Sequence, residues 1–185
     1  LQRTPLVHDR AGDAHYDCIS ALHKSLRGSD VDAALYWLAR MLEAGDDCRY
    51  VARRLMNFAA EDVGAAEPGA LGVAVAAAQA AQLMGMPEAG LPLAHATAYL
   101  ARCPKSVAVY KAFEAAKAAV REKGALPVPL HIRNAPTALM RELGCARGYV
   151  YPPDHGYPVR PQPYLPEALA DRTFWRFEAS LSAAP

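Results

Sequence analysis

The polar residues of this 185-residue chain form no pattern that catalysis or metal binding requires. There is no glycine-rich loop ending in Gly-Lys-Ser/Thr to hold phosphates, and the dinucleotide-binding, zinc-peptidase and serine-hydrolase signatures are also missing. His15 and His23 lie more than two helical turns apart, so we interpret them as partly buried or surface histidines and not as ligands of one metal. Glu61 and Asp62 are sequence neighbours that point in different directions on a helix, which favours solvated charges over a paired acid and base. We therefore expect no catalytic residue, no cofactor and no metal in this chain.

The cysteines indicate neither a zinc site nor a redox centre. They are far apart in sequence and form no Cys-x-x-Cys pair: Cys18, Cys48, Cys103 and Cys145. We interpret them as small apolar residues buried in the core, because free cysteine is among the most buried residue types.

Basic residues gather in one part of the chain, although the net charge is only +1. Residues 102–133 contain seven Lys or Arg and two acids, whereas residues 55–101 contain four acids and neither Lys nor Arg. This asymmetry fits a phosphate-contacting face or complementary surfaces between subunits, and an ordinary solvated helix face explains it more simply than either. The candidate DNA or anion contacts are Arg102, Lys105, Lys111 and Arg133.

A second polar grouping lies between prolines. His131, Arg133 and Asn134 follow an extended, proline-rich segment whose restricted backbone holds their side chains in place. We interpret the three as a buried, hydrogen-bonded strut that fixes the C-terminal segment to the helices, in preference to a ligand site.

The elements that position these residues are predicted to be helices. Apolar residues make up 52% of the chain, many of them alanine, and alanine and unbranched side chains favour helix. Glycines, prolines and capping residues divide the sequence into about seven expected helices, at roughly 14–26, 30–44, 47–63, 68–84, 92–102, 106–123 and 136–144. Short connections favour antiparallel neighbours in a compact bundle, with the alanine-rich helix at 68–84 in its centre.

Three regions are expected along the chain. Residues 1–13 begin without Met and are interpreted as a lead-in from a longer protein, and residues 14–144 form the helical domain. Residues 145–185 form a Pro- and Tyr-rich arm docked on the bundle, where prolines exclude regular helix between 148 and 166 and the last five residues fray. Without a secretory signal or an apolar run of about 18 residues, we expect a soluble, cytoplasmic protein that contacts no membrane.

The bundle is expected to have more apolar surface than one small core can enclose. Tyrosine, tryptophan and methionine are enriched where such surplus is buried between subunits. The candidate interface residues, all on short predicted helices, are Tyr36, Trp37, Met41, Tyr99 and Tyr110.

Several blocks of the sequence resemble the C-terminal domain of the replication-associated recombination protein A family, also called RarA or MgsA. These are AAA+ ATPases of the clamp-loader clade, and the Werner-helicase-interacting protein is their eukaryotic relative. The resemblance is carried by the block 15–45, which opens His15-Tyr16-Asp17-Cys18, and by Tyr50–Leu55, Ala60–Gly64, Pro104-Lys105-Ser106 and Val128–Thr137. Departures from the family pattern are small: Cys48 replaces a proline, Val107 an asparagine, and Cys145-Ala146 interrupts a Gly-Tyr-Gly run.

The resemblance implies an all-α domain, similar to the collar of clamp loaders, that assembles the parent ATPase into a homotetramer. ATP and Mg²⁺ would then bind to an upstream AAA+ region, into which residues 1–13 lead, and this chain would not itself be an enzyme. The parent would act in the nucleoid on DNA ends or gaps at stalled replication forks, with the single-strand-binding protein as a partner. The alternative is a DNA- or partner-binding module that uses the basic stretch 102–133.

Overall fold

The computed structural model describes residues 13–157 and 162–176, and within those ranges it confirms the all-α class, since they contain helices and no strand. The expectations for residues 1–12 and 181–185 lie outside the described ranges. The chain divides into two units, which we describe separately. Unit 1 comprises Leu1–Phe113 with Trp175–Pro185, and unit 2 comprises Glu114–Phe174. The division falls within helix α6 (Ala108–Lys123), ahead of residue 144, where sequence patterns placed the end of the helical domain.

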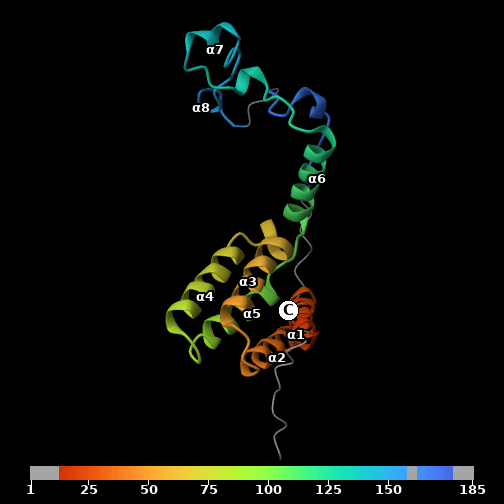
Figure 1. Ribbon diagram of the computed structural model, residues 1–185, viewed down its shortest axis with the longest axis vertical. Helices are drawn as coiled ribbons and strands as arrows, with labels where there is room; N and C mark the ends of the chain where they lie inside the picture. The colour runs from red at the N-terminus through yellow and green to blue at the C-terminus, as the bar shows by residue number, and fades with distance from the viewer. Residues whose placement is uncertain (1–12, 158–161, 177–185) are drawn as a thin grey trace, which may run out of the picture. The chain divides into compact units, whose positions relative to one another are not determined.

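Unit 1 is built on five helices that lie side by side in Figure 1: α1 (Asp13–Arg27), α2 (Val31–Glu43), α3 (Cys48–Phe58), α4 (Ala70–Met84) and α5 (Gly90–Arg102). Two of them begin at predicted capping residues. The side chain of Asp30 accepts a hydrogen bond from the Ala33 backbone N–H, and that of Asp47 accepts one from Arg49. Each carboxylate satisfies a backbone donor that the first turn would otherwise leave unpaired.

The sequence predicts that helix α3 continues to residue 63, but the regular α-helix ends at Phe58. A π-helical turn, η1 (Ala59–Val63), and a 3-10 turn, η2 (Gly64–Ala66), follow Phe58. At this point Gly64 adopts a φ of +53°, and a Cβ added there would lie 2.9 Å from the Ser106 carbonyl oxygen. The close approach of these two backbone segments therefore requires glycine.

The central helix of unit 1 is α5, not the alanine-rich α4. Helix α5 packs against α1, α2, α3 and α4, and its buried residues include Leu93, Ala96 and Leu100. Helix α4 packs mainly against α3 and α5 through four alanines, Ala70, Ala74, Ala77 and Ala81. The prediction that α4 is central was wrong because its small residues allow close approach on one face only. The opposite face, which includes Leu71 and Gln79, is exposed.

Unit 2 contains the end of α6 and short elements: η3 (Leu130–Ile132), α7 (Ala138–Glu142), α8 (Pro152–His155) and η4 (Glu167–Leu169). The expectation of no regular helix after residue 148 was wrong for α8. Proline is tolerated in a first helical turn, where its missing N–H costs no hydrogen bond, and α8 is little more than one turn long. None of the helices in the described ranges is long and apolar enough to cross a membrane.

Candidate functional site

Exposed apolar side chains are the main surface feature of unit 2. Among its described residues only Ala119 and Leu169 are buried. Leu139 and Leu143 are 64% and 62% exposed and lie four residues apart, on helix α7 and at its C-cap, hence on one face. The other large exposed residues include Val120, Val128, Leu130, Met140, Tyr149, Tyr151, Tyr157 and Tyr164. Unit 2 therefore has much more apolar surface than it encloses.

The predicted polar strut also lies in unit 2. The His131 Nε2 atom lies 2.7 Å from the Pro163 carbonyl oxygen, to which it can donate, and Arg133 Nε donates to the Val128 carbonyl at 2.7 Å. Asn134 is exposed, and the other two side chains are only half-buried. Together with Tyr149 and Tyr164, these residues line a cavity of about 290 Å³.

The candidate DNA or anion contacts are distributed over both units. Arg102 and Lys111 are exposed in unit 1, whereas Arg133 belongs to unit 2. Lys105 is half-buried, and its ammonium group donates to Ala101 O at 2.8 Å, Cys103 O at 2.6 Å and Ser29 Oγ at 3.0 Å. Burial lowers the pKa of Lys105. Its observed contacts are those of a cap on the last carbonyls of α5.

The candidate interface residues also differ in exposure. Tyr36 is 61% exposed and Tyr110 is exposed, while Trp37 and Tyr99 are half-buried against the core. The Tyr36 and Trp37 rings meet edge to face at 5.1 Å, and the Arg40 guanidinium lies 5.3 Å from the Trp37 ring centroid. Met41 is buried in the core of unit 1 and reaches no surface.

A partly buried ion pair in unit 1 was not expected from the sequence. Arg27 donates to both carboxylate oxygens of Asp62, with Nε to Oδ1 at 2.6 Å and Nη2 to Oδ2 at 3.3 Å, and the Asp62 side chain is 7% exposed. The Asp62 backbone carbonyl also accepts from the Ser106 N–H at 2.8 Å. The expectation that Asp62 is a solvated charge was therefore wrong. The π-helical turn directs its side chain towards α1, and the amino-acid pattern gave no signal of that turn.

His23 is buried close to this ion pair. Burial, followed by the charges of Arg54 and Arg27, lowers its pKa to about 4, so the imidazole is neutral at physiological pH. Its ring meets Phe58 edge to face at 5.8 Å. His15 instead lies 2.9 Å from an Asp46 carboxylate oxygen. No three His, Cys, Asp or Glu side chains within the described part of the chain are placed to hold a metal ion.

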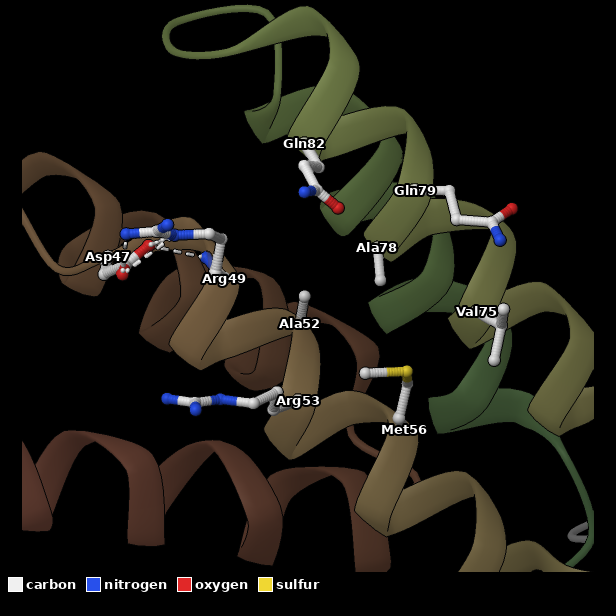
Figure 2. Close-up of a pocket in the computed structure, with 9 residues that line it drawn as sticks. All are labelled: Asp47, Arg49, Ala52, Arg53, Met56, Val75, Ala78, Gln79 and Gln82. Carbon is white, nitrogen blue, oxygen red and sulfur yellow. Dashed lines mark hydrogen bonds and ion pairs between the residues drawn. The ribbon is translucent and has the colours of Figure 1, made fainter.

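A groove of about 510 Å³ lies between α3 and α4 (Figure 2). Its polar lining residues are Arg49 and Arg53 on α3, whose guanidinium groups point away from α4 in Figure 2, and Gln79 and Gln82 on α4, of which Gln79 points away from α3. The apolar lining residues are Ala52, Met56, Val75 and Ala78. At one end, Arg49 binds both carboxylate oxygens of Asp47 at 3.0 to 3.2 Å.

Comparison with known proteins identifies the family. Residues 28–183 match the family described as MgsA AAA+ ATPase C terminal, and residues 1–27 match the AAA C-terminal domain family. The chain belongs to the MgsA/RarA family. The resemblance drawn from its sequence blocks is thus confirmed.

Relatives of this MgsA/RarA chain occur in bacteria and eukaryotes. It is 53% identical over 176 residues to an uncharacterised AAA domain-containing protein of Mycobacterium tuberculosis, covering 95% of the chain and 39% of that relative. It is 48% identical to replication-associated recombination protein A of Escherichia coli, covering 90% of the chain and 38% of that relative. It is 40% identical to ATPase WRNIP1 of Dictyostelium discoideum, covering 96% of the chain and 20% of that relative.

The chain thus spans well under half the length of these MgsA/RarA relatives. It matches their C-terminal, non-ATPase domain, and the catalytic motifs of the AAA+ ATPases lie outside the matched part.

Proposed function

We propose that this domain is the oligomerisation module of a MgsA/RarA-family AAA+ ATPase that acts in replication and recombination. The observation that carries the proposal is the exposed apolar surface of unit 2, where almost no described side chain is buried. Monomeric proteins rarely leave so many large apolar residues in water, and subunit interfaces are enriched in aromatic and methionine side chains. Closed symmetry is the default for contacts between identical chains, so the assembly is a homotetramer or its constituent dimer.

The contact is centred on α7, where Leu139 and Leu143 share one face. Tyr149, Tyr151 and Tyr164 extend it. Tyr36 and Tyr110 are the exposed candidates in unit 1 and would belong to a second contact, made by that unit. Trp37 and Tyr99 are half-buried against the core of unit 1 and would contribute their exposed parts to that second contact.

In the whole protein, this assembly would bring together ATPase domains that bind ATP and Mg²⁺. The matched relatives include replication-associated recombination protein A, whose name supports a role in replication and recombination. Following the family resemblance, we propose DNA ends or gaps in the nucleoid as the substrates of the parent. Its protein partner is the single-strand-binding protein. The chain itself binds no nucleotide and has no ATPase activity.

Light scattering of the purified chain tests the proposal directly. We expect a mass two or four times that of the 19.9 kDa chain, and a lower mass for the double variant Leu139→Glu/Leu143→Glu. Two buried carboxylates at an interface each cost several kcal/mol and dissociate it. The matched control is Leu83→Glu, which makes the same chemical change at a residue of unit 1 that is 87% exposed, and should keep the wild-type mass.

A wild-type chain that stays monomeric at high micromolar concentration would contradict the oligomerisation role. Dissociation by Leu83→Glu but not by the α7 double variant would move the interface to unit 1. Circular dichroism of each variant shows whether its helices are retained.

A second candidate function is DNA binding by residues 102–133, and the exposure of Arg102 and Lys111 favours it. The engagement of Lys105 with three protein acceptors counts against it. With few free cations, charge neutralisation supports only the weak, salt-sensitive binding typical of non-specific contacts, about micromolar or weaker. A titration with single-stranded DNA at low and high salt tests this, and tight binding at about 200 mM salt would favour the second function.

A further inference from the structure

The two family matches divide the chain at the end of helix α1. Residues 1–27 match the AAA C-terminal domain family, and residues 28–183 match the MgsA family. That division assigns α1 to the upstream domain. In the structure, however, α1 belongs to unit 1, where it packs mainly against α2 and also against α5 and α3. One helix is thus matched to one domain and packed into the other.

One face of α1 is enclosed in the core of unit 1. Leu22 and Leu26 are fully buried, and Ile19 is 4% exposed. Cys18 and His23 lie on the same helix face, as their spacing of three and four residues requires, and are also buried. Separating α1 from its neighbours would expose this apolar surface to water, which the hydrophobic effect opposes. Helix α1 therefore moves with unit 1 as one body.

The start of α1 is held by contacts of His15. Its Nδ1 atom lies 2.9 Å from a carboxylate oxygen of Asp46, to which it can donate, and the Asp46 side chain is only 6% exposed. The imidazole also packs against the Tyr50 ring, with 4.7 Å between the ring centroids. Helix ends commonly fray, whereas these contacts fix the first turn of α1 to α3 and to the turn that precedes it.

Contacts of α1 with α3 and the π-helical turn extend along the whole helix. Each joins a residue of α1 to one that lies 35 residues further along the chain: His15 to Tyr50, His23 to Phe58, and Arg27 to Asp62. The constant separation means that α1 runs alongside this part of the chain in the same direction. Its last residue, Arg27, donates to Asp62 at 2.6 Å, so both ends of α1 are fixed.

The turn between α1 and α2 is also fixed. The backbone N–H groups of Gly28 and Asp30 donate to carbonyl oxygens in the last turn of α1, at 2.9 and 3.0 Å. The Ser29 hydroxyl accepts a hydrogen bond from Lys105 at 3.0 Å, which ties the turn to the end of α5. No flexible linker therefore separates α1 from the rest of unit 1.

We propose that α1 is a rigid connector that transmits movement of the upstream AAA C-terminal domain to unit 1. This rests on the proposed function, in which the parent is an ATPase assembled by this domain. The match to the AAA C-terminal family continues to residue 27, so it includes all the fixed residues of α1. Displacement of the upstream domain then acts on His15 and, through Asp46 and Tyr50, on the turn between α2 and α3.

Hydrogen–deuterium exchange of the parent protein, with ADP or with a non-hydrolysable ATP analogue, tests the proposal. Exchange reports how often each segment opens. We expect exchange in the turn between α2 and α3 to differ between the two nucleotide states by about fivefold or more, the usual size of coupling between sites. A flexible Gly/Ser insertion between residues 12 and 13 should abolish the difference, because a flexible linker transmits no displacement.

A point variant tests the same connection without changing the length of the chain. His15→Ala removes the contacts with Asp46 and Tyr50 and should reduce the nucleotide-dependent difference to within about twofold, because the first turn of α1 is then free to open. The matched control is Asp17→Ala, at an exposed residue of the same turn, which should keep the full difference. Circular dichroism shows whether each variant is folded.

The isolated chain provides a separate test of the packing. A chain that begins at residue 28 lacks α1 and should lose the cooperative thermal transition of unit 1, since Leu22 and Leu26 no longer fill its core.

The proposal is overturned if exchange in unit 1 is the same in both nucleotide states, or if a difference survives the flexible insertion. Equal effects of His15→Ala and Asp17→Ala would also overturn it, as would an unchanged thermal transition in the chain that begins at residue 28. A parent that shows the expected exchange but is monomeric would contradict the oligomerisation role and leave the connector supported.

Discussion

The Arg27–Asp62 ion pair ties α1 to the π-helical turn that follows α3, and His23 lies in the same buried region. Charges in such surroundings act on one another more strongly than in water, because little solvent screens them. Arg27 is half-exposed, so the pair keeps part of its hydration while Asp62 is enclosed. Burial and the positive charges of Arg54 and Arg27 keep His23 neutral in the folded chain. The stability of unit 1 therefore depends on pH.

We predict that the free energy of unfolding falls as the pH is lowered from about 6.5 to about 4. The unfolded chain takes up a proton at His23 near its ordinary pKa of 6.5, whereas the folded chain does so only near pH 4. Protonation therefore favours the unfolded state throughout this window, by about 1.4 kcal/mol per pH unit and about 3 kcal/mol in total. Urea unfolding at several pH values measures the slope.

The matched variant for that prediction is His23→Gln, which keeps a polar, neutral side chain. For this variant, the free energy of unfolding should change less steeply with pH than for the wild type. The difference should correspond to about one proton fewer taken up on unfolding, whatever the stability of the variant at neutral pH. Carboxylates contribute equally to both slopes, so their difference isolates His23. Parallel slopes would show that His23 is not the group responsible.

At the scale of elements, helix ends were predictable where a local signal marks them. Asp30 and Asp47 cap α2 and α3 as expected, and Gly85 follows the last residue of α4. The π-helical turn could not be predicted, because its hydrogen bonds depend on tertiary contacts of Asp62 and Gly64. The position of α4 at the side of the bundle was also missed, since composition reports which residues are small and not which face they cover.

The central position of α5 yields a prediction about packing. Leu100→Ala should lower the free energy of unfolding by about 2–5 kcal/mol, because it leaves a cavity where α5 meets the other helices. Leu91→Ala removes the same atoms from the same helix at a residue that is 76% exposed, and should change stability by about 0.5 kcal/mol or less. Chemical denaturation of both variants checks the difference, and equal losses would place the core elsewhere.

At the scale of the whole molecule, the family and the all-α class followed from sequence, whereas the division into two units did not. Helix α6 has a continuous helical pattern, so nothing in it marks Phe113 and Glu114 as a boundary. The candidate interface drawn from sequence relied on aromatic residues of the early helices, and Met41 proved to be core. The exposed surface around Leu139 could be recognised only once the structure showed how little unit 2 buries.

Truncation separates the roles of the two units. A chain that ends at residue 113 keeps the contiguous core of unit 1 and should retain a cooperative thermal transition. It lacks unit 2, so light scattering should give the mass of one chain at concentrations where the complete chain assembles. A truncated chain that still forms the full assembly would contradict an interface on α7.

The structure excludes substitutions at Gly64 and permits them at Gly72. At position 64, every other amino acid places a Cβ against the Ser106 carbonyl in a backbone conformation that L-residues rarely adopt. Position 72 lies within α4, on its exposed face, where an added Cβ meets nothing within 4 Å. Alanine there would stabilise the helix by about 1 kcal/mol. In a saturation library selected for folding, position 64 should therefore retain glycine alone, while alanine becomes enriched at position 72.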